Sequence, residues 1–302
     1  MDERRIIFLV NPISGTAKKT RIVQYIQKIF TEKQVSFEIL PTHETGDYRI
    51  IEDKIETENI TDIVIVGGDG SVNHAVSALH KYPVNFGIVP FGSGNGLARS
   101  AGIPMNSKEA IETVLHGTPS NVDAFMINDR FACMLTGLGL DAQVAHDFAK
   151  KNTRGLMTYV TQSIADFFKS HPYPFEIKVN DRAFFTEAYF ISIANANQFG
   201  NNFTIAPKAY LNDGLLDIVI VQKMKKARLP FAILKQLRGN NKLKEEISQI
   251  NSDNILYFQA ETLEISNPNH APLHIDGEPI EATENYKIHI LKDCFKLLIK
   301  KN

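Results

Sequence analysis

DIVIVGGDGSVNHA, at residues 62–75, is the stretch that decides the fold of this chain. An apolar run of β-branched residues extends from Ile63 to Val66, and such a run predicts a fully buried strand. Glycines and an aspartate follow at residues 67–71, and an apolar helical pattern begins at Val72. A strand, a glycine turn and a helix in this order let backbone N–H groups wrap a phosphate, because glycine permits close approach and positive φ. The stretch therefore predicts a phosphate-binding turn.

The acid inside this turn indicates which ligand it suits. Asp69 would repel a bare phosphate, so its presence makes sense if a divalent cation lies between its carboxylate and the phosphate oxygens. A glycine turn with a capping aspartate is the simpler interpretation of GGDG taken alone, because short motifs have weak specificity. The other motifs of the chain favour the phosphate interpretation.

The composition excludes several classes of protein. The chain has 302 residues, enough for two domains with a core each, and its net charge of −1 carries no nucleic-acid signature. No window approaches the run of about 18 apolar residues that a membrane-spanning helix needs, and the first apolar run is too short for a secretory signal. Cys133 and Cys294 are far apart, and the histidines lack a zinc-binding spacing. We expect a cytoplasmic protein without a transmembrane segment that does not bind nucleic acid.

The first part of the chain alternates between strand and helix patterns, which predicts parallel crossovers and a three-layer α/β domain over residues 1–122. Strands are expected at residues 6–10, 35–40, 63–66 and 85–89, and helices at 22–30, 50–55, 72–79, 97–101 and 106–116. The last of these helices begins with a capping box at Asn106 and Glu109. Ligands bind beyond the carboxyl ends of the strands in such sheets, and four loops with polar residues or glycines follow strand ends there.

The second part, residues 123–302, is expected to be a mainly antiparallel β-sandwich. The tripeptide Asn-Asp-Arg occurs at residues 128–130 and at 180–182 between alternating residues, as it does in β-hairpins. Further strands are expected at 184–194, 215–222, 262–266, 273–275, 287–291 and 296–299, with helices near 155–170 and 227–239. The pattern leaves open whether the last strand returns to the first domain.

Six motifs together resemble one family. In order they are NPISG (11–15), VGGDGSVNHAV (66–76), PFGSGNGLAR (90–99), GLGLDAQVA (137–145), LNDGLLD (211–217) and IDGEP (275–279). The chain resembles the diacylglycerol kinase catalytic domain family, which includes bacterial soluble lipid kinases and the sphingosine and ceramide kinases. Each motif is weak alone, but six at family-like separations cover nearly the whole chain. The family's fold, an α/β nucleotide-binding domain followed by a β-sandwich, agrees with the periodicity.

The resemblance implies that the chain binds ATP together with Mg²⁺. The residues that match the family's nucleotide positions are Asn11, Thr42, Gly67, Gly68, Asp69, Gly70, Ser71, Asn73 and Ser93. Their chemistry is suitable, because N–H groups and hydroxyls donate to phosphate oxygens and Asp69 acts through Mg²⁺. For Asn11 taken alone, a turn after a strand is an equally good interpretation.

The resemblance also implies catalytic carboxylates near the end of the chain. Glu278 matches the family's general base, which takes the proton of a lipid hydroxyl as the γ-phosphoryl group transfers. Asp276 is expected to help with magnesium or to orient Glu278. The alternative is a hairpin in which Asp-Gly is turn chemistry and the glutamate is merely exposed.

A second, structural magnesium is implied by residues 211–215. The carried-over ligands are the Asp213 carboxylate and the backbone carbonyls of Tyr210 and Leu215, a reasonable set for a hard cation. The simpler interpretation is an Asn-Asp-Gly turn that enters a strand. Asp141, in the fourth motif, receives no role.

The acceptor is less well indicated than the reaction. Ser71 and His74 stand where the bacterial enzymes typically carry threonine and glutamate, and Gly96 replaces an aspartate. The GSGN loop is closer to the sphingosine and ceramide kinases. A diacylglycerol and a sphingoid-type alcohol therefore remain as acceptors.

A lipid kinase must reach a membrane surface, and residues 222–246 combine eight lysines and arginines with an apolar set. A basic amphipathic helix of this kind suits an anionic surface, although packing of its apolar face against the sandwich is the more common arrangement.

The leading hypothesis is an ATP- and Mg²⁺-dependent lipid kinase. An NAD-kinase-like enzyme is an alternative, because that family also carries GGDG, and a nucleotide-binding regulator without catalysis is another. The sequence leaves open whether the chain forms a homodimer.

Overall fold

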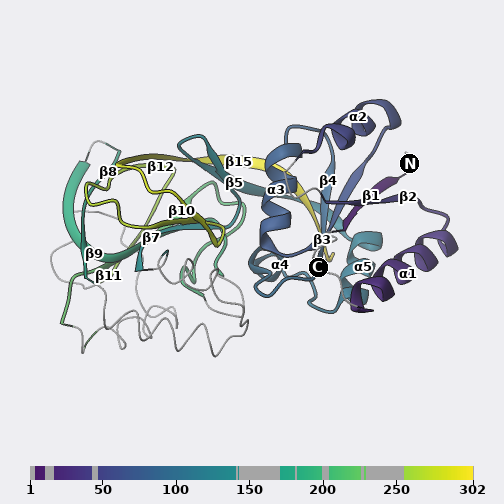
Figure 1. Cartoon of the computed structure of the whole chain (residues 1–302), viewed down its shortest axis with the longest axis horizontal. Coiled ribbons are helices and arrows are strands. Elements are labelled where there is room, and N and C mark those ends of the chain that lie inside the picture. The colour runs from purple at the N-terminus through teal and green to yellow at the C-terminus, as the bar shows by residue number, and fades with distance from the viewer. Residues whose placement is uncertain are drawn as a thin grey trace. The chain divides into compact units, whose positions relative to one another are not determined.

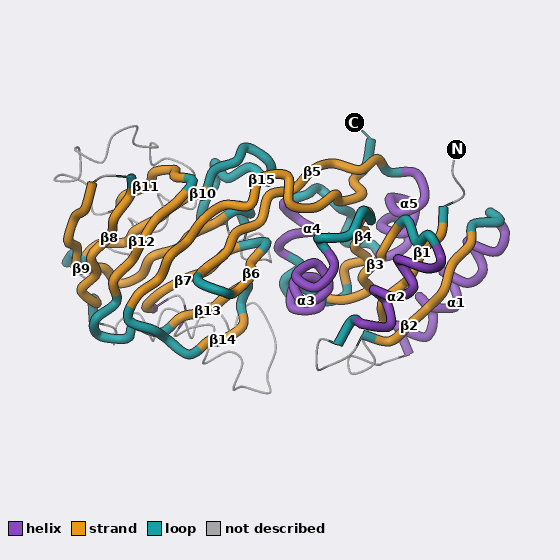
Figure 2. The backbone as a smooth tube through the Cα atoms, turned by 90° about the horizontal axis from the view of Figure 1, so that it is seen from above, coloured by secondary structure: helices purple, strands orange, loops and turns teal. Residues whose placement is uncertain are grey.

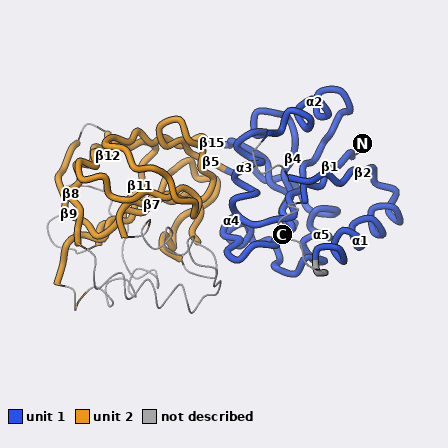
Figure 3. Tube along the Cα trace, in the orientation of Figure 1, with its two compact units in different colours: residues 1–122, 293–302 blue, residues 123–292 orange. Residues whose placement is uncertain are grey.

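The computed structural model describes residues 4–10, 17–42, 47–140, 142, 171–180, 182–198, 204–225, 228 and 255–301. The chain divides into two compact units (Figure 3): unit 1 comprises residues 1–122 and 293–302, and unit 2 comprises residues 123–292. Unit 1 contains all of the described α-helices of four or more residues, and unit 2 consists mainly of strands. Among the described residues, no helix is long and apolar enough to cross a membrane.

Unit 1 is built on a parallel sheet. Its strands are β1 (Arg5–Val10), β2 (Ser36–Pro41), β3 (Asp62–Gly67) and β4 (Asn85–Pro90), in the spatial order β4-β3-β1-β2. All six residues of β3 are buried, as expected of a central strand that is covered on both faces. The end of β15 (Asn285–Ile299) extends the sheet, because it pairs in parallel with β4 at Lys296 and Asn85.

Helices cover both faces of this sheet. They are α1 (Ala17–Glu32), α2 (Arg49–Glu58), α3 (Asp69–Leu79), α4 (Gly96–Ser100) and α5 (Ser107–His116). α3 lies on one side of the strands and α5 on the other in both Figure 1 and Figure 2, and α1 packs with α5. The three-layer α/β prediction is therefore confirmed.

Two helix starts show how far local patterns reach. The capping prediction at α5 is confirmed in its first half, because the Asn106 side chain accepts hydrogen bonds from the N–H groups of Lys108 and Glu109. The start of α3 was predicted at Val72, but the helix begins at Asp69. Gly68 is its extended N-cap, so most of the predicted glycine turn is the first turn of the helix.

Unit 2 is a set of antiparallel strands around one apolar core (Figure 2). The strands are β6 (Arg130–Ala132), β7 (Leu135–Gly139), β8 (Tyr173–Val179), β9 (Arg182–Ala194), β10 (Leu216–Gln222), β11 (Ile255–Ala260), β12 (Thr262–Ser266), β13 (Leu273–Ile275) and β14 (Glu278–Ile280), together with the second part of β5 (Thr118–Ile127) and the first part of β15. β9 pairs with β8 in its first half and with both β7 and β10 in its second half, so one long strand connects most of the unit.

Both predicted Asn-Asp-Arg hairpins are present. Ile127 pairs with Arg130 and Val179 with Arg182, and the intervening Asn128 and Asn180 have positive φ angles of 51° and 53°. Asparagine tolerates this left-handed conformation better than most residues.

The prediction of two separate strands at residues 287–291 and 296–299 is wrong, because β15 is continuous over 15 residues. Asp293 has a positive φ of 50°, and the alternation of buried and exposed residues shifts near it, which hides the continuity from a pattern with period two. β7, β11 and β14 were not predicted. The helices expected near 155–170 and 227–239 lie outside the described residues.

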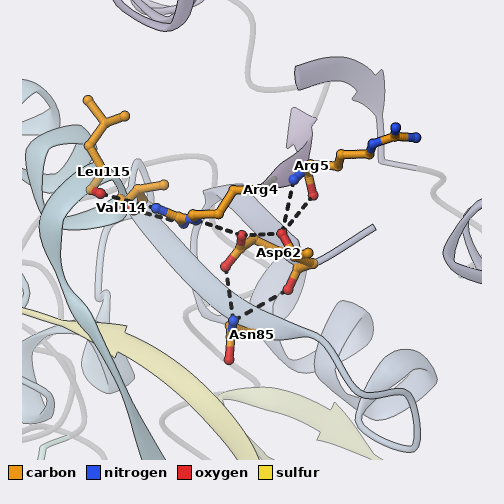
Figure 4. Close-up of polar contacts among 7 residues, drawn as sticks. Arg4, Arg5, Asp62, Asn85, Val114 and Leu115 are labelled. Atoms are coloured by element: carbon orange, nitrogen blue, oxygen red, sulfur yellow. Dashed lines mark hydrogen bonds and ion pairs between the residues drawn. The ribbon is translucent and has the colours of Figure 1, made fainter. Parts of the chain in front are cut away.

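A polar cluster holds the amino end of the unit 1 sheet (Figure 4). The carboxylate of Asp62 is buried and accepts hydrogen bonds from the Arg4 guanidinium at 2.9 Å, the Thr61 hydroxyl at 2.6 Å and the Asn85 amide at 3.1 Å. Arg4 also donates to the carbonyl oxygens of Val114 and Leu115 at the end of α5. The cluster therefore joins β3, β4 and α5 far from the carboxyl ends of the strands.

We predict that Arg4→Met destabilises the protein by about 3 kcal/mol, because it leaves the Asp62 charge buried without its cation. Urea denaturation followed by circular dichroism measures the change. Arg5→Met is the matched control: Arg5 is exposed and donates to Glu58, and its loss is expected to change the free energy of unfolding by about 0.5 kcal/mol or less. Equal effects of the two substitutions would contradict this account of the cluster.

Candidate active site

At the carboxyl edge of the unit 1 sheet, two glycine loops are in backbone contact. Gly68 follows β3, Gly92 follows β4, and the N–H of Phe91 donates to the carbonyl of Gly67 at 2.8 Å. A Cβ atom on Gly68 would lie 2.9 Å from the Cα of Gly92, and a Cβ on Gly92 would lie 2.5 Å from the Cα of Gly68. Only glycine at both positions allows this approach, so the two predicted nucleotide loops form one rigid edge.

The second loop is closed by Asn95. Its side chain accepts from the N–H of Gly92 and donates to the carbonyl of the same residue, both at 2.9 Å, while its own φ is 53°. Arg99 donates to the carbonyl of Gly94 at 3.1 Å. Ser93 is exposed between these fixed points. The role of Asn95 was not predicted, although asparagine is one of the residues that tolerate a left-handed turn conformation.

The predicted residues of the GGDGS stretch lie at the start of α3. Asp69 is the first residue of the helix, and the first intrahelical hydrogen bond joins the N–H of Val72 to the carbonyl of Gly68 at 3.1 Å. The positive end of the helix dipole therefore lies at Asp69, where it stabilises the aspartate and attracts anionic ligands. Ser71 and Asn73 are partly exposed in the first turns.

Thr42 lies at the same edge. Its N–H donates to the carbonyl of Val10 at 3.1 Å, and the residue is buried. Asn11, the next residue after Val10, lies outside the described residues, and so does Asp141. Gly70 is partly exposed within the first turn of α3.

In unit 2, Glu278 begins the second strand of a hairpin whose turn has two residues. Ile275 pairs with Glu278, and the turn residues Asp276 and Gly277 have positive φ angles of 49° and 86°. Both angles are those of the hairpin turn that favours Asp-Gly. The Asp-Gly turn considered in the sequence analysis is therefore present. Glu278 is exposed, as the predicted role of a general base requires.

The carboxylate of Asp276 is buried and holds this hairpin in place. One of its oxygens accepts from the N–H groups of Met134 and Leu135 at 3.0 and 2.8 Å, and the other accepts from the N–H of Cys133 at 3.0 Å. In return, the N–H of Asp276 donates to the carbonyl of Leu135 at 2.8 Å. Both oxygens are therefore engaged by backbone donors at residues 133–135, where the chain passes from β6 into β7.

His274 supports the same turn from within β13. Its Nδ1 accepts from the N–H of Gly277 at 3.2 Å, and its carbonyl accepts from the Thr136 hydroxyl at 2.6 Å. The side chain is completely buried. His274 was not predicted as a site residue, because Thr136 becomes its neighbour only when β13 pairs with β7.

The segment with the predicted metal ligands precedes β10. The Asp213 carboxylate accepts from the N–H of Leu215 at 3.0 Å, and Tyr210 is 69% exposed. Asp123, which is buried and was not predicted, accepts from the N–H of Gly214 at 2.7 Å. Desolvation raises the pKa of Asp213, and repulsion from Asp123 adds to the effect.

Among the residues that the structure describes, no group of three or more His, Cys, Asp or Glu side chains gathers as a metal site. The expected donor set differs from such a group, because it combines one carboxylate with backbone carbonyls. Two nearby carboxylates, one of them with a raised pKa, fit a hard cation there, because a cation would relieve their repulsion.

A third carboxylate near this segment, that of Asp217, is completely buried on β10. It accepts hydrogen bonds from the Tyr257 hydroxyl at 2.6 Å and the Gln259 amide at 3.0 Å. Burial raises the pKa of Asp217 to about 6, although both hydrogen bonds oppose the shift.

We predict that Gly92→Ala lowers the free energy of unfolding by about 2 kcal/mol, because the added methyl group collides with the backbone of Gly68. Thermal denaturation measures the loss. Ser93→Ala in the same loop is the control, since Ser93 is exposed and its substitution is expected to change stability by about 0.5 kcal/mol or less. An unchanged melting temperature for Gly92→Ala would rule out the close backbone contact.

Comparison with family models covers both units. The model described as "Diacylglycerol kinase catalytic domain" matches residues 5–127, and the model described as "YegS C-terminal NAD kinase beta sandwich-like domain" matches residues 135–298. The expected β-sandwich of the second part is thus confirmed, and so is the resemblance found in the motifs.

Individual proteins agree. The chain is similar to "Diacylglycerol kinase" of Bacillus subtilis, with 27% identity over 287 residues, covering 92% of this chain and 90% of that protein. It is 29% identical to a "Probable lipid kinase YegS-like" of Enterobacter over 259 residues, covering 83% of this chain and 82% of that protein. A crystal structure of a diacylglycerol kinase from Bacillus anthracis matches with a TM-score of 0.74 and 18% identity, covering 99% of this chain and 98% of that chain.

Proposed function

Since this chain belongs to the lipid kinase family defined by the diacylglycerol kinase catalytic domain, we propose that it transfers the γ-phosphoryl group of ATP to a lipid hydroxyl with the help of Mg²⁺. The acceptor is a diacylglycerol or a sphingoid-type alcohol. The observation that carries the proposal is the Asp276 anchor, because it fixes a hairpin whose next carboxylate, Glu278, is exposed to a substrate.

The glycine edge of unit 1 would bind the nucleotide phosphates. The N-terminus of α3 and the loop closed by Asn95 offer backbone N–H groups, and Thr42, Ser71 and Ser93 add hydroxyls. Asn11, Gly67, Gly70 and Asn73 complete the proposed set. Because the loops are fixed by the contact of Gly68 with Gly92, binding costs little reorganisation.

Glu278 would act as the general base. It would take the proton of the lipid hydroxyl while the oxygen attacks the γ-phosphorus, and the bond from that phosphorus to the β,γ-bridging oxygen breaks. Asp276 orients Glu278 rather than binding metal, because backbone N–H groups already engage both of its oxygens.

Mg²⁺, when bound, would neutralise charge on the phosphate oxygens. Asp69 would hold it at the nucleotide, and the structural cation would be held by the Asp213 carboxylate and the carbonyls of Tyr210 and Leu215. The chain's own contribution is to present these oxygens from a helix start and from a short segment before β10.

The kinase is tested by the release of ADP from Mg-ATP with mixed micelles of diacylglycerol, sphingosine, ceramide or monoacylglycerol. NAD is included as a soluble acceptor, because an NAD-kinase-like activity would show there. Turnover with NAD alone, or ATP binding without turnover on any acceptor, would overturn the lipid kinase proposal.

We predict that Glu278→Gln lowers kcat on the preferred lipid by about 10²–10⁴, since the amide cannot accept the proton. The KM for ATP should stay within about threefold, because the substitution changes proton transfer and not nucleotide contacts. Glu281→Gln is the matched control, because Glu281 is exposed directly after β14, and it should keep full activity. Unimpaired turnover in Glu278→Gln would remove it as the base.

Peripheral contact with a membrane is part of the proposal. Lys225 and Arg228 are exposed, and the rest of the basic segment beyond residue 228 lies outside the described residues. An exposed cation near an anionic surface contributes about 1 kcal/mol to binding.

We predict that the triple variant Lys225→Glu, Lys226→Glu and Arg228→Glu binds anionic vesicles at least about tenfold more weakly than the native chain. Sedimentation with phosphatidylserine-containing vesicles measures this. Reversal of Lys178, Lys287 and Lys292, which are exposed on strands of unit 2, gives the same change of charge as a control. Equal binding of the triple variant and the native chain would contradict membrane contact through these basic residues.

A further inference from the structure

Two side chains of β11 clamp the segment that carries the proposed structural metal ligands. Tyr257 and Gln259 are two residues apart on this strand, so they lie on the same face. The N–H of Lys208 donates to the Tyr257 hydroxyl at 3.0 Å, and the Gln259 amide lies 3.4 Å from a carboxylate oxygen of Asp213. The strand thus contacts the segment at both ends.

Asp217 joins Tyr257 and Gln259 through hydrogen bonds, and the three side chains together are called the clamp. The Tyr257 hydroxyl donates to one oxygen of Asp217 at 2.6 Å, and Gln259 donates to the other at 3.0 Å. Asp217 is completely buried and Tyr257 is 1% exposed, so water does not replace these bonds. Backbone pairing of Asp217 with Gln259 sets the register of the two strands.

Each member has a defined task. Asp217 accepts a hydrogen bond from the Tyr257 hydroxyl, which leaves the lone pairs of that oxygen to accept from the N–H of Lys208. The Gln259 amide group reaches both Asp213 and Asp217, which keeps the two carboxylates apart at a fixed distance. Gln259 is only partly buried, whereas the other two form part of the interior.

We propose that Asp217, Tyr257 and Gln259 are positioning residues that hold residues 208–215 in the shape that binds a divalent cation at Asp213. The inference rests on the proposed function, because it takes Tyr210, Asp213 and Leu215 as the ligands. Hydrogen-bond partners behind metal ligands typically change metal affinity by about 10–100-fold when they are removed. Gln259 and Tyr257 are hydrogen-bond partners of this kind, because they contact Asp213 and the backbone of Lys208.

The test measures divalent-cation binding by the full chain without nucleotide or lipid, so that a cation carried by ATP does not contribute. Mg²⁺ is titrated against the melting temperature, and Mn²⁺ binding is measured by electron paramagnetic resonance. We expect Tyr257→Phe and Gln259→Met each to weaken binding of both ions about tenfold. Asp213→Asn should abolish it.

Tyr286→Phe is the matched control. Tyr286 is equally buried in unit 2, and its hydroxyl accepts from the N–H of Thr283 at 2.8 Å, outside the clamp. It should lose stability as Tyr257→Phe does while keeping native cation affinity. If Tyr257→Phe fails to fold, Gln259→Met still decides, because its side chain is partly exposed.

Native affinity in Gln259→Met and in folded Tyr257→Phe would overturn the clamp. No cation response in the native chain would also overturn it, because there would be no site to position. If the cation binds and depends on the clamp, while no lipid is phosphorylated, then the inference stands and the proposed lipid kinase activity fails.

Discussion

The burial of carboxylates governs where the polar parts of this structure lie. Among the aspartates that the structure describes, four are at most 6% exposed, namely Asp62, Asp123, Asp217 and Asp276. A carboxylate removed from water costs several kcal/mol unless donors replace its hydration, so each of these side chains must organise the groups around it. Much of the structure beyond the apolar cores follows from how the four are compensated.

The compensation differs with location. An arginine, a hydroxyl and an amide surround Asp62 at the amino end of the unit 1 sheet, where only stability is at stake. Backbone N–H groups compensate Asp276, and they fix the path of the chain because they belong to three successive residues. Two neutral side chains, Tyr257 and Gln259, donate hydrogen bonds to Asp217, which ties β10 to β11. The same physical requirement thus stabilises the unit 1 sheet at Asp62, anchors the hairpin at Asp276 and joins two strands at Asp217.

Periodicity predicts what is local, and this chain shows where that limit lies. The β-branched run at Ile63–Val66 and the Asn-Asp-Arg turns could be recognised because their signals lie within a few residues. The start of α3 was placed late because glycine and aspartate have low helix propensity, yet tertiary context places them in its first turn. β15 was split because the positive φ of Asp293 interrupts the alternation.

The site could be predicted only as a set of separate motifs. Resemblance to a family pointed to Glu278, Asp276, Asp69 and Asp213, but not to the backbone donors that engage Asp276 or to the partners of Asp213. Asp276 meets its donors at Cys133 and Leu135 across more than 140 residues of chain, and Tyr257 meets Asp217 across 40. No local pattern contains such pairings, because they arise when β13 pairs with β7 and β10 with β11.

The two carboxylates of the Asp-Gly-Glu turn illustrate why burial separates roles that sequence cannot. Asp276 and Glu278 are chemically equivalent groups two residues apart, and either could remove a proton in principle. Asp276 and Gly277 reverse the chain in left-handed conformations; the Asp276 side chain, within the turn, enters the interior, and the Glu278 side chain, after the turn, faces solvent. A general base must reach the proton that it takes, and a carboxylate whose oxygens are both engaged by backbone donors inside the protein cannot do so. The anchoring of Asp276 therefore supports Glu278 as the base of the proposed proton transfer.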